Sequence, residues 1–201
     1  EATLEGILWW LGMHAGAMIS WQTGILMPFA LQNLEANAKA AAAGLPLPHI
    51  VTPSFQAHYH IGGTMLALVI IMLFFTKSAH LRQIGRLALV PAIFGIWEPM
   101  WFGAPFALNP IFFIPLVLTE VVTMGLTYVL MYFNIIGRTY VLSLWTIPAP
   151  LGAFLGAGDI RNTIWNLVLI GITFAIWYPF FVVYDRQLLE KERATGVSEA
   201  A

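Results

Sequence analysis

The feature that most constrains this chain is the recurrence of long apolar runs along its whole length. The run from Ile7 to Leu31 contains no Asp, Glu, Lys or Arg, and residues 111–137 and 163–184 form two further runs. A membrane-spanning helix needs about 20 mostly apolar residues, and each run is long enough. Hydrophobic residues make up 59% of the chain and charged residues only 9%, whereas a soluble domain has about 25% charged residues. The sequence therefore predicts an all-α membrane protein with several spanning helices.

The composition also excludes several classes of function. The chain contains no cysteine, which excludes disulfides, cysteine metal sites and cysteine nucleophiles. Its net charge of −1 gives no support for nucleic acid as a partner. His49, His58 and His60 do not have the spacing of a zinc signature, and no acidic residue follows them at a metal-ligand distance. We therefore expect no metal site and no cofactor.

Prolines interrupt the region after the first run. Pro46, Pro48 and Pro53 prevent one continuous helix in the polar stretch 32–60. The next apolar run, Ile61 to Thr76, is short for a full crossing. This part of the chain is predicted to contain short or broken helices.

Two further segments, 87–110 and 139–160, are apolar but broken by proline. They are predicted to be re-entrant, with 87–110 entering and leaving from the cytoplasmic side and 139–160 dipping in from the other side. Irregular backbone at membrane depth needs protein or a water-filled cavity to satisfy its polar groups. Broken helices of this kind surround the binding sites of many secondary transporters.

Basic residues indicate the orientation. The loop 77–86 holds the densest basic cluster between spans, namely Lys77, His80, Arg82 and Arg86. The positive-inside tendency places this loop in the cytoplasm. Residues 186–201 are charged and follow a span directly, so we expect them to form a cytoplasmic tail after a membrane domain of residues 1–185.

Glu98 is the only charged residue in the segment FGIWEPMWFGAPFALNP, residues 94–110. A carboxylate inside a membrane segment costs a few kcal/mol, so it needs a partner or a function. One interpretation is a structural ion pair or a residue at a helix end. The other is a ligand site, because Trp97 and Trp101 flank the carboxylate. Aromatic rings with a carboxylate suit a sugar, and an amine or a proton would suit the carboxylate equally well.

Three other positions are candidates for the same site. His14 lies near the middle of the first apolar run, where a histidine is either a packing residue or a ligand-binding group. Gly62 and Gly63 open a short segment, and they allow either close helix packing or backbone amides exposed to a ligand. Glu120, in a later span, is assigned no role.

Six separated motifs resemble those of one known family. They are GIWEP with FGAPFALNPIFFIPLVL, LPHIVT at 47–52, IGG at 61–63, FFTKSAHLRQIGRLALVPAIF at 74–94, WTIPAP at 145–150 and YPFFVVYDRQLL at 178–189. In their order along the chain they are similar to membrane IIC subunits of the bacterial phosphoenolpyruvate-dependent sugar phosphotransferase system, in the lactose/cellobiose (chitobiose) branch. The resemblance covers essentially all 201 residues and corresponds to the C-terminal half of the family's chain.

The resemblance implies a sugar permease in the bacterial inner membrane, with its C-terminus in the cytoplasm. A phosphorylated IIB protein, charged in turn by IIA, would phosphorylate the sugar, and the N-terminal half missing here would complete a homodimer. Glu98 would hydrogen-bond the sugar's 6-hydroxyl and orient it or accept its proton. The other substrate-binding positions implied by the resemblance are His14, Gly62, Gly63, Trp97, Asn109 and Trp145.

The chain departs from the family pattern at three positions. Trp97 stands where the family usually has Asn, and Ala15 and Ala17 stand where it has Gly and Asn. These departures leave open which sugar binds. Two alternatives also stay open, namely an ion- or proton-coupled carrier and a permease fragment without activity.

Overall fold

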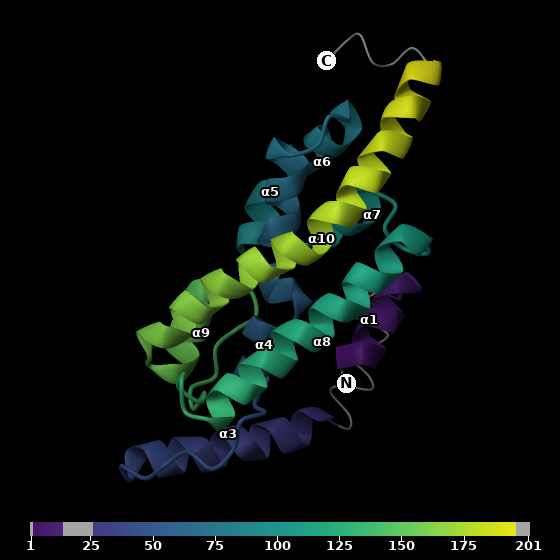
Figure 1. Cartoon of the computed structure of the whole chain (residues 1–201). Coiled ribbons are helices and arrows are strands. Elements are labelled where there is room, and N and C mark those ends of the chain that lie inside the picture. Colours follow the sequence, from purple (N-terminus) through teal and green to yellow (C-terminus); the bar gives the residue numbers. More distant parts are fainter. Residues whose placement is uncertain (1, 14–25, 196–201) are drawn as a thin grey trace.

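The computed structural model describes residues 2–13 and 26–195, and every regular element in those ranges is a helix. The elements are α1 (Ala2–Trp10), α3 (Met27–Ala42), α4 (Pro53–Tyr59), the 3₁₀ helix η2 (Ile61–Thr64), α5 (Leu66–Phe74), α6 (Ala79–Ile93), α7 (Glu98–Gly103), α8 (Pro110–Tyr132), α9 (Ala149–Ala157) and α10 (Ile160–Thr195). Figure 1 shows α8 and α10 as the two long helices, with the shorter helices arranged around them.

Helices α8 and α10 are the two described helices that are long and apolar enough to cross a membrane. Within their most apolar stretches only 33% and 28% of the residues are buried. The core helix of a soluble protein would bury most of these residues, whereas a lipid-facing helix leaves them outside. Both helices coincide with runs predicted as spans.

Two tryptophans on α10 attach it to a row of threonines on α8. The Nε1 of Trp177 donates to Oγ1 of Thr119, and the Nε1 of Trp165 donates to Oγ1 of Thr127, both at 2.8 Å. The two threonines lie on one face of α8, and each hydroxyl donates to the carbonyl four residues earlier. An indole N–H inside a membrane protein needs such an acceptor, so these bonds fix how α10 lies on α8.

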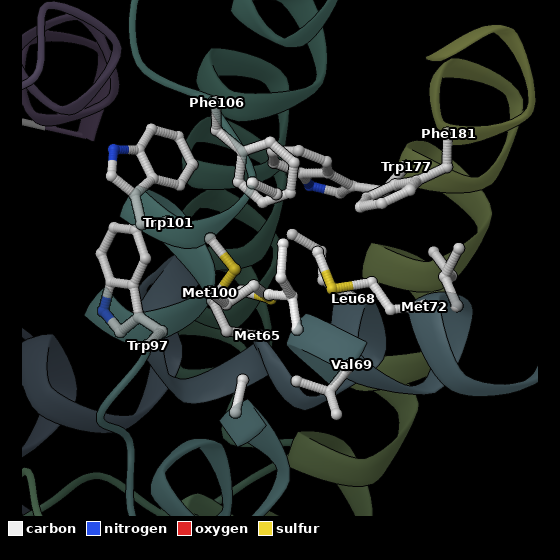
Figure 2. Close-up of a cluster of buried hydrophobic side chains, with 14 of the residues drawn as sticks. Met65, Leu68, Val69, Met72, Trp97, Met100, Trp101, Phe106, Trp177 and Phe181 are labelled. Atoms are coloured by element: carbon white, nitrogen blue, oxygen red, sulfur yellow. The ribbon is translucent and has the colours of Figure 1, made fainter. Parts of the chain in front are cut away.

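The larger hydrophobic core lies where α5, α6, α7 and the ends of α8 and α10 meet. Met65, Met100 and Phe106 are fully buried at its centre. Figure 2 shows Trp97 and Trp101 on one side of this cluster and Trp177 and Phe181 on the other. The core therefore holds the start of α7, where Glu98 lies.

One predicted span is wrong as a single helix. The run 7–31 begins in α1, but α1 ends at Trp10 and the chain turns at Gly12, whose φ is +75°. The positive φ is a conformation that glycine adopts without cost, so the sequence supplies a helix stop that hydropathy alone does not register. The next described helix, α3, starts at Met27.

The predicted loop 77–86 is also wrong in part. Helix α6 begins at Ala79, because the Ser78 side chain caps it by accepting from the Leu81 N–H at 3.2 Å. The basic residues 80, 82 and 86 therefore lie on the first turns of α6 rather than in a loop.

The segment 87–110 does reverse direction, as predicted. The chain turns at residues 94–97, and α7 packs back on α6, with the Cβ position of Gly103 only 3.4 Å from the Ile84 side chain. We call α6 and α7 the first hairpin. Its side of the membrane stays a prediction.

A second reversal lies in 139–160. Residues 139–144 are irregular and run back along α9, and the Gly156 carbonyl accepts from the N–H groups of Tyr140 and Val141 at 2.9 and 3.1 Å. We call residues 139–157 the second hairpin. After it, α10 continues to Thr195, so the first part of the predicted tail, 186–195, is helical.

Candidate functional site

The tips of the two hairpins touch each other. A Cβ atom placed on Gly95, in the turn of the first hairpin, would lie 2.8 Å from the carbonyl oxygen of Trp145, in the turn of the second. Gly95 also has a φ of +74°, so two constraints favour glycine at this position. This contact brings two proline-broken segments together, which the sequence placed on opposite sides of the membrane.

Glu98 lies at this junction. It is the first residue of α7, directly after the N-cap residue Trp97, and Pro99 follows it in the first turn. Its side chain is half-buried, and its Oε2 atom is buried. A carboxylate in the first turn interacts favourably with the helix dipole. Helix α7 therefore holds Glu98 at the edge of the core.

Three tryptophans form a wall beside Glu98. The ring centroids of Trp9, on α1, and Trp97 are 4.1 Å apart, and those of Trp97 and Trp101 are 5.2 Å apart. Trp9 and Trp97 are 4% exposed, and Trp101 is fully buried. Rings at these distances and inclined to one another attract each other beyond the area they bury. The wall is therefore a packed, buried aromatic layer at the start of α7, the helix that carries Glu98.

Trp101, the third ring of this wall, also carries a buried polar atom. Its Nε1 is buried and has no hydrogen-bond partner among the described residues. A buried N–H without an acceptor costs free energy, so such groups often have a role beyond packing.

The structure brings together three of the residues that the sequence singled out. Trp97 and Glu98 lie at the tip of the first hairpin, and Trp145 lies at the tip of the second, with a side chain that is 55% exposed. His14 lies outside the described residues.

Gly63 is closely packed against the preceding helix. The Cβ position of Gly63 would lie 2.3 Å from the His58 carbonyl oxygen, and its own N–H donates to the His60 carbonyl at 3.1 Å. These contacts favour close packing at Gly63 over an amide open to a ligand. Gly62 lies in the same 3₁₀ helix.

Asn109 has contacts that explain it structurally. It is the N-cap of α8, and its Oδ1 accepts from the Ile111 N–H at 3.1 Å. Its carbonyl oxygen accepts from Nε1 of Trp10 at 2.9 Å, which ties α1 to the start of α8. Its place in substrate binding stays a prediction.

Trp9 is the residue of this site that sequence reasoning missed. Its position at the start of an apolar run is typical of an interface belt. The structure instead buries it against Trp97. No local pattern signals this contact, because it depends on the packing of two segments far apart in the sequence.

Two surface hollows of about 300 and 330 Å³ lie elsewhere, and both are lined by Arg138. Neither is lined by Glu98, Trp97 or Trp145. The Arg138 guanidinium donates to the carbonyl of Leu47 at 2.6 Å, so it ties the segment after α8 to the segment after α3. The hairpin tips combine a carboxylate with tryptophan side chains, and neither residue type lines either hollow.

Comparison with known proteins identifies the family. Residues 2–119 match the family model described as Phosphotransferase system, EIIC. The chain belongs to this family. This EIIC chain is 35% identical over 196 residues to the putative permease IIC component YwbA of Bacillus subtilis (strain 168), an alignment that covers 95% of this chain and 44% of the relative.

Other relatives of this EIIC chain have names that specify a sugar. It is 34% identical over 191 residues to the lichenan permease IIC component of the same organism, covering 92% of this chain and 42% of the relative. It is 35% identical over 192 residues to the lactose-specific EIICB component of Staphylococcus haemolyticus (strain JCSC1435), covering 92% and 32%. This EIIC chain thus spans less than half the length of each of these relatives.

A solved structure has the same fold. The transporter ChbC, the IIC component from an N,N′-diacetylchitobiose-specific phosphotransferase system, matches with a TM-score of 0.89 and 32% identity, over 96% of this chain and 45% of that chain. The match confirms the predicted helical transporter fold. Together with the lactose-specific relatives, it confirms the lactose/cellobiose branch predicted from the motifs.

Proposed function

We propose that this EIIC chain provides the sugar-binding part of a permease for a β-linked disaccharide or oligosaccharide. The names of its relatives support this substrate class, because they specify lichenan, oligo-β-mannoside, lactose and N,N′-diacetylchitobiose. The bound sugar lies at the tips of the two hairpins, and Glu98 is its principal polar contact.

The observation that carries the proposal is the placement of Glu98 beside an aromatic wall. The C–H faces of a pyranose ring pack well on indole, and its hydroxyls donate hydrogen bonds to a carboxylate. The exposed side chain of Trp145 supplies a ring face for the sugar, Trp9 and Trp97 support the site from the core, and the Oε2 of Glu98 lies in the buried part of the site. Binding sites for small molecules typically combine an apolar lining with a few convergent polar groups.

The same geometry suits transfer of a phosphoryl group to the sugar. In the proposed reaction a phosphocysteine of a IIB protein is the donor, and this chain contains no cysteine of its own. The sugar's 6-hydroxyl oxygen forms a bond to phosphorus, the S–P bond breaks, and the thiolate leaves on IIB. Glu98 orients the hydroxyl and accepts its proton as a general base.

The partners follow from this role. Phosphorylated IIB, recharged by IIA, approaches from the cytoplasm of a bacterial cell, and the permease lies in the inner membrane as a homodimer. The remaining length of the relatives supplies the rest of the permease. The start of α6 and the end of α10 face the cytoplasm.

The test is sugar binding by wild type and by Glu98→Gln. Equilibrium binding of radiolabelled cellobiose and N,N′-diacetylchitobiose is measured on the chain purified in detergent. The variant removes a hydrogen bond to a charged acceptor, worth about 1.5–3 kcal/mol, so at least one sugar should bind roughly 10- to 150-fold more weakly.

Glu35→Gln is the matched control, because Glu35 lies exposed on α3 and pairs with Lys39 in the same helix. It should leave the affinity unchanged. Equal sugar binding by wild type and Glu98→Gln would remove Glu98 from the site and contradict the proposal.

A further inference from the structure

Away from the hairpin tips, three side chains from distant parts of the chain converge. They are Glu5 on α1, His60 at the end of α4 and Glu120 on α8. Each offers one ligand atom, and the three atoms all lie within 4.8 Å of one another. The distance from Nδ1 of His60 to Oε1 of Glu5 is 3.8 Å. The local spacing around His60 predicted no metal, and the fold adds two ligands from helices remote in sequence.

The packing of α1 on α8 explains why the carboxylates meet. Gly6 lies so close to α8 that a Cβ atom there would be 3.1 Å from the Cα of Val117. Glu5 directly precedes Gly6, Glu120 follows Val117 by about one turn, and the ligand atoms of the two carboxylates lie within 4.8 Å of each other. Two acidic groups are thus held together by a close helix crossing.

The cluster is deeply placed. Glu120 is fully buried, and the side chains of Glu5 and His60 are 12% and 21% exposed. Buried ionisable groups of this kind are found paired with one another or coordinating a metal ion.

We infer that Glu5, His60 and Glu120 bind one divalent metal ion. A Zn²⁺ ion has N and O ligands at about 2.0–2.2 Å, so two ligands at a tetrahedral angle are about 3.4 Å apart. The observed 3.8 Å is close to this separation and longer than a charge-assisted hydrogen bond. Small side-chain rotations close the set. Three protein ligands leave a fourth position for water.

The ligand types favour zinc over the hard cations. Imidazole with two carboxylates is a mixed N/O set, whereas Mg²⁺ and Ca²⁺ prefer oxygen alone. The ion would join α1, the junction of α4 with η2, and α8. Because Trp9 lies one turn after Glu5 on α1, the metal would also hold the aromatic wall in place. This inference does not depend on which sugar binds.

The test uses the full chain, purified in detergent and stripped with a chelator. Zn²⁺ is titrated in competition with a chromophoric chelator, and Co²⁺ is added as a spectroscopic probe of N/O coordination. We expect one equivalent of Zn²⁺ per chain, a visible Co²⁺ absorption band that Zn²⁺ displaces, and a higher unfolding temperature with metal.

Glu120→Gln and His60→Gln should each weaken Zn²⁺ binding at least tenfold and remove the Co²⁺ band. His80→Gln, which changes an exposed histidine on α6, should leave both unchanged. The absence of saturable Zn²⁺ binding to wild type would overturn the inference whatever the variants do. The inference is equally wrong if both cluster variants bind Zn²⁺ as tightly as wild type. It is also wrong if acidification without metal raises the unfolding temperature as much as Zn²⁺ does.

Discussion

The backbone of Gly95 lies against the carbonyl oxygen of Trp145, and a Cβ at position 95 would stand 2.8 Å from that oxygen. Gly95→Ala should therefore separate the hairpin tips. An alanine at a φ of +74° costs about 1–2 kcal/mol, and the clash with backbone adds to this. We expect a lower unfolding temperature and weaker sugar binding, measured by thermal melting and by equilibrium binding in detergent.

Gly125→Ala is the matched control. Gly125 lies within α8, and a Cβ atom there would meet nothing within 4 Å. Alanine is favoured over glycine inside a helix by about 1 kcal/mol, so this variant should be as stable as wild type or more so. If both variants behave alike, the hairpin contact is not what sets the stability.

A second contact joins α10 to the turn before α6. The carboxylate of Asp185, on α10, accepts from the N–H of Ser78 at 2.8 Å and from the N–H of Lys77 at 3.0 and 3.1 Å. Asp185 is only 7% exposed. Asp185→Ala should destabilise the fold by about 3 kcal/mol, because hydrogen bonds to a charged acceptor are lost from a buried site. Hydrogen exchange of the amides at 77 and 78 should accelerate.

Glu190→Ala provides the comparison for Asp185, because Glu190 is an exposed acid on the same helix. Its removal should change the free energy of unfolding by less than about 0.5 kcal/mol, as is usual for surface substitutions. Slow exchange of the amides at 77 and 78 in Asp185→Ala would show that another group holds this turn.

The sequence predicts the helical class and the two long spans because hydropathy over twenty residues is a strong signal. It also predicts the reversals in 87–110 and 139–160, because several prolines in an apolar segment exclude one straight helix. The break after Trp10 is different. It depends on a turn at Gly12 inside an apolar run, and hydropathy averages across such a turn.

The sequence predicts part of the candidate site. Glu98 stands out in the sequence because it is the only charge in its segment. The contacts of Trp9 with Trp97, and of Glu5 with His60, join segments remote in the chain. No local pattern encodes these distances, since they result from how α1 packs on α8 and α7. Sequence therefore identifies the acid, and the fold identifies its neighbours.

The start of α10 should respond to acid. Asp159 precedes the helix, and its Oδ1 accepts from the Arg161 N–H at 2.9 Å. The hydrogen bond from the Arg161 side chain holds the pKa of Asp159 below its ordinary value. A carboxyl with a lowered folded-state pKa stabilises the fold above its unfolded pKa, and this stabilisation is lost as the pH falls through the folded pKa.

Asp159→Asn keeps a capping side chain and removes the charge. At pH 7 it should be less stable than wild type, by at most about 1 kcal/mol because the pair is partly exposed. The difference in unfolding temperature should shrink as the pH falls below the usual range of an aspartate. A difference that stays constant down to that acidic range would contradict a contribution from the charge.

The orientation of the domain can be tested with single cysteines, because the chain has none of its own. His80 and Glu190 are both exposed, on the first turn of α6 and near the end of α10. Basic residues in and near these turns predict that both positions lie in the cytoplasm. Cysteines at 80 and 190 should therefore react with a membrane-permeant maleimide and resist an impermeant one in intact cells. Opening the cells should make both sites reactive to the impermeant reagent. Labelling at 80 from outside intact cells would reverse the orientation and put the first hairpin on the other side.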